Sequence, residues 1–196
     1  MQDSSRAMTI AGALVPRSAS WINYIVDSVL IVGYAALTGL SAQVSVYLNP
    51  AVPITGQTFA VLLAGATLGF KRGTASMLVY LGAGVAGIPV FAPSGAISGA
   101  SRGYLVGFVA AAAIVGYLVE RGWARNPLKL LLAMLIGEVA IYAVGLPWLA
   151  FYVPGDKVLE WGLTPFIPGD AIKMAMAAFG APLALAGIRR FKGEES

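Results

Sequence analysis

The sequence feature that most constrains this chain is a succession of long apolar stretches with almost no charge. The stretch from Leu130 to Tyr152, for example, holds one charged residue, Glu138. Of the 196 residues, 58% are hydrophobic and 11% are charged, whereas about a quarter of a soluble domain is charged. Since a helix of about 20 apolar residues spans a bilayer, we expect an all-α integral membrane protein.

The residue types that are missing exclude several kinds of chemistry. The sequence holds no cysteine and no histidine, which excludes disulfides, Ser-His-Asp triads and HExxH zinc sites. The segment from Gly65 to Arg72 lacks the spacing of a phosphate-binding loop. The net charge of +4 comes without a basic run among aromatic residues, so nucleic acid is not an expected partner. We expect no catalytic residue and no metal site.

The apolar stretches divide into six transmembrane helices, at about residues 21–48, 58–70, 74–88, 104–119, 130–152 and 171–188. Ten of the 13 positive residues then fall on one side of the membrane, namely Arg6, Arg17, Lys71, Arg72, Arg121, Arg125, Lys129, Arg189, Arg190 and Lys192. This asymmetry favours six spans over five and places both termini in the cytoplasm. The predicted parts are a cytoplasmic lead at 1–20, a transmembrane domain at 21–190 and a cytoplasmic tail at 191–196.

A polar stretch with two prolines, from Thr164 to Lys173, precedes the last span. Asp170 opens the expected helix, and Lys173 lies three residues later on the same face. Because charges at this depth need partners or water, the two residues predict a polar site that faces the protein interior. The alternative is that Asp170 only caps the helix while Lys173 extends to the lipid headgroups.

Two further features inside the spans leave alternatives open. Glu138 lies one turn before Tyr142, and a carboxylate within a span is a candidate for function or a protonated acid bonded to a neighbouring helix. Ala35, Gly39 and Ala42 place small residues on one face of the first span. That face predicts either packing within the chain or docking of a partner membrane protein.

Four motifs follow one another along the chain: Pro53-Ile-Thr-Gly-Gln-Thr-Phe-Ala60, Gly87-Ile-Pro-Val-Phe-Ala92, Gly103-Tyr-Leu-Val-Gly-Phe108 and Pro165-Phe-Ile-Pro-Gly-Asp-Ala-Ile-Lys173. Together they resemble BioY, the family of biotin-binding substrate-capture (S) subunits of energy-coupling-factor (ECF) transporters. The resemblance covers about residues 36–186 and implies the S-component fold of six helices, with a ligand site near the outer surface. The family's Gly-Pro-Thr-Gly-Gly-Tyr reads Gly99-Ala-Ser-Arg-Gly-Tyr104 here.

The resemblance implies biotin as the ligand. Asp170 can accept hydrogen bonds from its ureido group, while Lys173 donates to the ureido carbonyl or braces Asp170. For the carboxylate of biotin, the candidates are Arg102 and the hydroxyl groups of Ser94, Ser101 and Tyr104. Candidate walls for the apolar bicycle are Phe91, Tyr104, Tyr142 and Trp148, and Glu138 is a candidate for contact with the ligand or with a neighbouring helix.

The resemblance also implies partners in a prokaryotic plasma membrane. A separate transmembrane coupling (T) subunit and cytoplasmic ATPases would supply the energy, so ATP is used by the partners and this chain needs no cofactor. Ala35, Gly39 and Ala42 are the implied docking face. The alternatives are a capture subunit for another vitamin, such as thiamine or riboflavin, an intramembrane enzyme that uses Glu138, Asp170 and Lys173, and a purely structural subunit.

Overall fold

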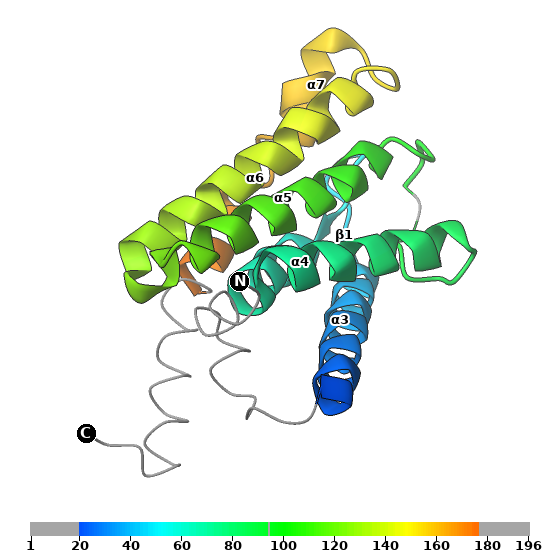
Figure 1. Cartoon of the computed structure of the whole chain (residues 1–196). Helices are drawn as coiled ribbons and strands as arrows, with labels where there is room; N and C mark the ends of the chain where they lie inside the picture. Colours follow the sequence, from blue (N-terminus) through cyan, green and yellow to red (C-terminus); the bar gives the residue numbers. More distant parts are fainter. Residues whose placement is uncertain (1–19, 94, 177–196) are drawn as a thin grey trace.

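The computed structural model describes residues 20–93 and 95–176 (Figure 1). In chain order the elements are α3 (Ser20–Gln43), β1 (Ser45–Val46), β2 (Ile54–Thr55), α4 (Gln57–Val85), α5 (Arg102–Glu120), the 3₁₀ helix η1 (Trp123–Arg125), α6 (Pro127–Leu149) and α7 (Gly155–Gly162). Residues 167–176 are also helical. The predicted tail at 191–196, Ser94, and the predicted lead at 1–20 except Ser20 lie outside the described residues.

Helix α5 lies between α4 and α6 and packs against both (Figure 1). Two glycines allow the backbones to approach closely. A Cβ atom on Gly107 would lie 2.9 Å from the Cα of Ile141 in α6, and one on Gly116 would lie 2.4 Å from the carbonyl carbon of Gly69 in α4. Since no side chain fits at such distances, the small residues of α5 set the spacing of the three helices.

Helix α4 is broken at Gly69, where φ is 80° and ψ is −174°. Only glycine adopts such a conformation readily, and α5 holds the break in place, because Glu120 Oε1 accepts a hydrogen bond of 3.0 Å from the Phe70 N–H. The sequence predicts two short helices here, but it places their boundary at residues 71–73. The boundary is wrong by a few residues, since Lys71 and Arg72 belong to the first turns of the second half.

Two other boundaries also differ from the prediction. The first helix ends at Gln43 instead of residue 48, because the chain turns into β1, which pairs antiparallel with β2. The Gln43 side chain donates to the carbonyl oxygens of Pro89 and Phe91, both at 3.3 Å, and so joins this turn to the loop after α4. Between the predicted spans at 130–152 and 171–188, where the sequence predicts no helix, the chain forms helix α7.

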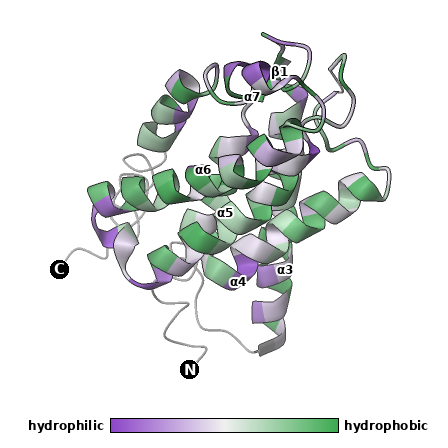
Figure 2. Cartoon of the chain, turned by 90° about the horizontal axis from the view of Figure 1, so that it is seen from above, coloured by the Kyte–Doolittle hydropathy of each residue, from purple (hydrophilic) through white to green (hydrophobic). Residues whose placement is uncertain are grey.

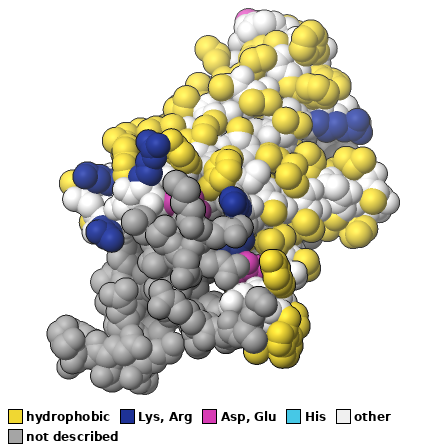
Figure 3. Space-filling view, viewed as in Figure 1, with side chains coloured by type: hydrophobic (Ala, Val, Ile, Leu, Met, Phe, Trp, Pro, Cys, Tyr) yellow, Lys and Arg dark blue, Asp and Glu magenta, His cyan; other side chains and the backbone are white. Residues whose placement is uncertain are grey.

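The surface of the described helices is largely apolar. Within the described residues, α3, α5 and α6 are long and apolar enough to cross a membrane. Hydrophobic residues run along α5 and α6 (Figure 2) and cover much of the face that Figure 3 shows. Val29, Leu40 and Val139 are exposed. Apolar surface of this extent is a liability in water and suits contact with lipid.

The small residues of α3 pack within the chain. Ala35 and Ala42 are buried, and a Cβ atom on Gly39 would lie 3.0 Å from the Cβ of Val90 in the loop after α4. Close approach to that loop explains why a glycine stands at position 39. Burial of Ala35, Gly39 and Ala42 within the chain favours the packing interpretation of this face over the docking interpretation.

Candidate functional site

A pocket opens between α4, α5, α6 and residues 166–173, and the loop after α4 closes one side of it. Its free space is about 910 Å³ when the open mouth and the solvent in front of it are included. The walls are mostly apolar, from Val52, Pro53, Phe91, Ile97, Leu105, Phe108, Ile141 and Phe166. Its polar side chains are Thr55, Gln57, Thr58, Ser98, Ser101, Arg102, Tyr104, Glu138, Tyr142 and Lys173.

Asp170 does not itself line this pocket but lies behind one end of it, at the centre of a polar cluster with the lining residues Thr58, Tyr142 and Lys173. Its side chain is 4% exposed, and its carboxylate accepts hydrogen bonds from Tyr142 Oη at 2.5 Å and Thr58 Oγ1 at 3.2 Å. Neither donor belongs to the helix of Asp170, and the backbone N–H of Asp170 donates to the carbonyl of Phe166, the residue just before that helix. Asp170 therefore joins three helical segments, and the capping alternative is not what the structure shows.

Lys173 lines the pocket and stabilises Asp170. Its Nζ lies 3.2 Å from Asp170 Oδ1 and also donates to the Thr55 carbonyl at 2.8 Å and to Thr58 Oγ1 at 3.2 Å. An ammonium group has three N–H donors, so these contacts use all of them. Lys173 thus connects its helix to the turn from β2 into α4 and does not extend toward the headgroups.

Glu138 lies on α6 beside this cluster. The residue is 4% exposed, it lines the pocket, and Asp170 and Lys173 are the charged groups that act on it. Neither of its carboxyl oxygens has a hydrogen-bond partner among the described residues. A buried carboxyl group without a donor is costly when it is ionised, so its place in the site needs an explanation beyond packing.

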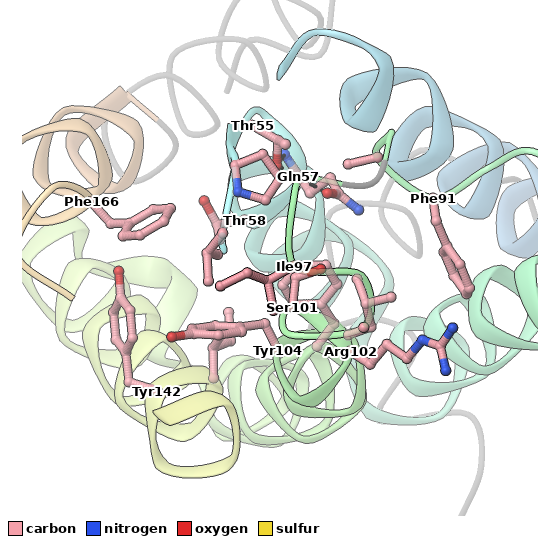
Figure 4. Close-up of a pocket in the computed structure, with 18 of the residues that line it drawn as sticks. Thr55, Gln57, Thr58, Phe91, Ile97, Ser101, Arg102, Tyr104, Tyr142 and Phe166 are labelled. Carbon is pink, nitrogen blue, oxygen red and sulfur yellow. Dashed lines mark hydrogen bonds between the residues drawn. The ribbon is translucent and has the colours of Figure 1, made fainter. Parts of the chain in front are cut away.

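Aromatic side chains form the body of the pocket (Figure 4). The rings of Tyr104 and Tyr142 meet edge to face at 6.2 Å, and the Tyr104 hydroxyl donates to the Gly162 carbonyl at 3.0 Å. Figure 4 shows Tyr142 and Phe166 on one side of the pocket and Phe91 with Arg102 on the opposite side. Arg102 is exposed, so the pocket has an acidic end inside and a cation at its edge.

The structure brings together most of the residues that the sequence predicts. The pocket is lined by Phe91, Ser101, Arg102, Tyr104, Glu138, Tyr142 and Lys173, with Asp170 bonded directly to two of them. Ser94 lies outside the described residues. Trp148 does not line the pocket: its indole N–H donates to the Gly99 carbonyl at 3.0 Å and its ring stacks on Tyr152, so it holds the loop instead.

Sequence reasoning missed the contribution of residues 52–58 and of two phenylalanines, Phe108 and Phe166. A signal existed for the first group, because Thr55, Gln57 and Thr58 are polar residues between two prolines and an apolar span. The sequence analysis used that segment only as a family motif and named none of its residues as a candidate for ligand binding. No local signal separates Phe108 from other aromatic residues in spans, because only the packing of α5 turns it toward the pocket.

The described residues hold no group of three or more His, Cys, Asp or Glu side chains that could bind a metal ion. Fold and pocket together define a helical membrane protein that binds a small molecule, with polar groups at two ends and an apolar body. A sequence profile of the BioY family matches residues 8–190. The chain therefore belongs to the BioY family, a family of transporters and not of enzymes.

Individual relatives agree with this assignment. The chain is 42% identical over 152 residues to the probable biotin transporter BioY of Pyrococcus horikoshii. This match covers 76% of this chain and 89% of that protein. Identity to the biotin transporter BioY of Thermotoga maritima is 37% over 150 residues, and this match covers 74% of this chain and 87% of that protein. The crystal structure of the S-component for biotin from an ECF-type ABC transporter has a TM-score of 0.74 at 24% identity, covering 88% of this chain and 95% of that one. The chain shares that fold.

Proposed function

We propose that this chain is a biotin-binding S component that captures biotin at the outer face of the membrane for uptake. One observation carries the proposal: each of the four family motifs contributes to the same pocket. Thr55, Gln57 and Thr58 come from the first motif, Phe91 and Ala92 from the second, Tyr104, Leu105 and Phe108 from the third, and Phe166 and Lys173 from the fourth. Segments far apart in the sequence thus build one site.

The acidic end of the pocket suits the ureido group of biotin. This group offers two N–H donors and one carbonyl acceptor, and the cluster of Asp170, Thr58 and Lys173 holds acceptors and donors within hydrogen-bond distance of one another. The contacts of Lys173 with Thr55, Thr58 and Asp170 favour a bracing role for this residue over direct donation. Asp170, fixed by Lys173, is then the acceptor for the ureido N–H groups.

The opposite end of the pocket suits the carboxylate of biotin. Arg102 stands in the first turn of α5 and lies across the pocket from Tyr142 and Phe166 (Figure 4). A guanidinium group binds a carboxylate through paired N–H donors. Between the two ends, the rings of Phe91, Tyr104, Phe108 and Phe166 supply apolar surface for the bicycle and the aliphatic tail.

We also propose a topology of six spans with both termini in the cytoplasm of a prokaryotic cell, in a multi-pass plasma membrane protein. Three observations support this proposal: α3, α5 and α6 are candidate spans, α4 is broken into two halves at Gly69, and residues 167–176 are helical where the sixth predicted span begins. The rest of that span, residues 177–188, lies outside the described residues. The lead at 1–20 and the tail at 191–196 would then be cytoplasmic. Arg102 and Lys157 would lie outside, on the side where the pocket opens.

Uptake by such a subunit requires an energy source from other chains. The sequence has no phosphate-binding loop, so we propose a transmembrane T subunit and cytoplasmic ATPases as partners, with biotin as the cargo. The relatives are named biotin transporters, and the structural neighbour is the S-component of an ECF-type ABC transporter. These names support the proposed partnership.

Calorimetric titration of the detergent-purified chain tests the proposal. We expect biotin to bind tightly, with thiamine and riboflavin as negative controls. Binding of thiamine or riboflavin in place of biotin would identify a capture subunit for another vitamin on the same scaffold. A folded sample that binds none of the three would contradict the proposal.

A further inference from the structure

The charges at the inner end of the pocket do not balance. Two acidic side chains, Asp170 and Glu138, lie there with one ammonium group, that of Lys173. All three N–H donors of Lys173 are used by Asp170, Thr55 and Thr58. Within the described residues, no donor reaches either oxygen of Glu138.

We propose that Glu138, beside Asp170, holds a proton, and that bound biotin makes the site hold this proton more tightly. The second part rests on the proposed function of the pocket as a biotin site. Glu138 is then a proton-binding residue, and the strength of ligand capture depends on pH.

The surroundings of the two acids decide which of them carries the proton. Asp170 accepts hydrogen bonds from Tyr142 and Thr58 and is paired with Lys173, and these contacts stabilise its ionised form. Glu138 has none of them. When two neighbouring buried carboxyl groups have only one cation nearby, ionising both of them costs a large electrostatic free energy. The proton therefore resides on Glu138.

The other groups around Glu138 do not remove this imbalance. On its own helix it faces Tyr142, and α5 contributes Tyr104, which packs on Tyr142. Residues 167–176 contribute Asp170 and Lys173, and α4 contributes Thr58, which does not titrate. Arg102, the cation on the pocket wall formed by α5, is exposed on the opposite side. Among these groups, Lys173 is the cation next to Glu138, and Asp170 already engages it.

Ligand binding raises the free energy needed to ionise Glu138 beside the ionised Asp170. The empty pocket is open to water at its mouth, and water screens charge. A bound biotin replaces this water with an apolar bicycle and lowers the local dielectric, which makes ionised Glu138 less favourable. The bound state therefore holds the proton more tightly than the empty state does. By linkage, affinity for biotin falls as pH rises through the range in which the empty site loses the proton.

Titration calorimetry with biotin from about pH 6 to about pH 9, above the range in which the carboxyl group of biotin titrates, tests the linkage. Two buffers with different ionisation enthalpies at each pH count the protons taken up. We expect Kd to rise by up to about tenfold per pH unit, the slope for one proton. Glu160→Gln, which changes an exposed glutamate away from the pocket, is the matched control and keeps this slope, whereas Glu138→Gln loses it.

A second readout does not depend on biotin. The infrared C=O stretch of a protonated carboxyl group should be present at neutral pH in the wild-type chain and in Glu160→Gln, and absent in Glu138→Gln. A missing band in the wild-type chain, or a band that persists in Glu138→Gln, overturns the proton assignment. A flat pH profile in the wild-type chain, or an equal slope in Glu138→Gln, overturns the linkage. Lack of biotin binding by the wild-type chain rejects the proposed function, while the infrared band still decides where the proton lies.

Discussion

Two ion pairs of the same length lie within the apolar body of this protein, and they have different surroundings. Arg72 in α4 pairs with Asp27 in α3 at 3.2 Å, with side chains that are 11% and 19% exposed. Lys173 pairs with Asp170 at 3.2 Å within one helix. The first pair connects two helices and does not line the pocket, whereas the second lies at the inner end of the pocket and reaches α4 and α6 through Thr58 and Tyr142.

This difference shows what a charge in an apolar helix does and does not indicate. A charged residue in an apolar helix indicates that a polar partner lies close to it, because burying an isolated charge costs free energy. Whether the partner is structural or belongs to a binding site depends on the space beside it. The Asp27 and Arg72 pair holds α3 against α4, while the Asp170 and Lys173 pair leaves a cavity at its side.

The largest effect is expected for Lys173→Met. The change removes the cation from a buried carboxylate, and losing one partner of a buried pair costs about 3–5 kcal/mol. We expect loss of measurable biotin binding and a clear drop in thermal stability in detergent, measured by calorimetric titration and thermal unfolding. Biotin affinity close to that of the wild-type chain would show that the inner pair does not support the site.

The second effect is expected for Asp170→Asn, which keeps the shape of the side chain and removes its charge. A hydrogen bond to a charged group is worth about 1.5–3 kcal/mol, so the Kd for biotin should rise about 10-fold to 150-fold. Titration with biotin measures the change, and Glu160→Gln provides the control for loss of an exposed carboxylate. Unchanged affinity in a folded variant would assign Asp170 a structural role like that of Asp27.

A smaller effect, on stability alone, is expected for Asp27→Asn. The pair with Arg72 is partly exposed, so we expect a loss of about 1–2 kcal/mol in the free energy of unfolding. Biotin affinity should stay unchanged, because neither residue lines the pocket. A double-mutant cycle with Arg72→Gln isolates the energy of the pair. A marked loss of biotin affinity in Asp27→Asn would remove the distinction between the two pairs.

The smallest effect is expected for Lys157→Gln in α7. Lys157 pairs with Glu160 at 2.6 Å on the surface, and this hydrogen bond raises the pKa of Lys157, so the ammonium group stays charged at neutral pH. Exposed pairs add little to stability, because water screens them. Thermal unfolding and biotin titration should match the wild-type chain. A clear change in either would mean that α7 takes part in the site.

The sequence predicted the helical stretches well because hydrophobic patterns are local. The predicted spans at residues 104–119 and 130–152 are close to α5 (Arg102–Glu120) and α6 (Pro127–Leu149). Boundaries that depend on distant contacts were less accurate. The break at Gly69 requires Gly116 and Glu120 from α5, and the end of α3 at Gln43 involves contacts with Pro89 and Phe91.

For the candidate site, the sequence identified residue types but not their partners. Asp170, Lys173 and Glu138 were recognisable as charges in or beside spans. By contrast, the small residues Ala35, Gly39 and Ala42 fitted two interpretations, and their burial within the chain favours packing. The spacing of residues on one helix cannot show which other segment covers it.

By itself, the sequence determined that this is a helical membrane protein of the BioY family, since apolar length, charge placement and ordered motifs are all properties of the linear chain. Only the tertiary structure decided which polar groups meet. Thr58 and Asp170 are 112 residues apart along the chain and form a hydrogen bond of 3.2 Å, while Glu138 lies beside the same cluster and receives no hydrogen bond from the part of the chain that the structure describes. The physical reason is that a buried charge is stabilised by whatever the fold places next to it, and that neighbour is set by helix packing.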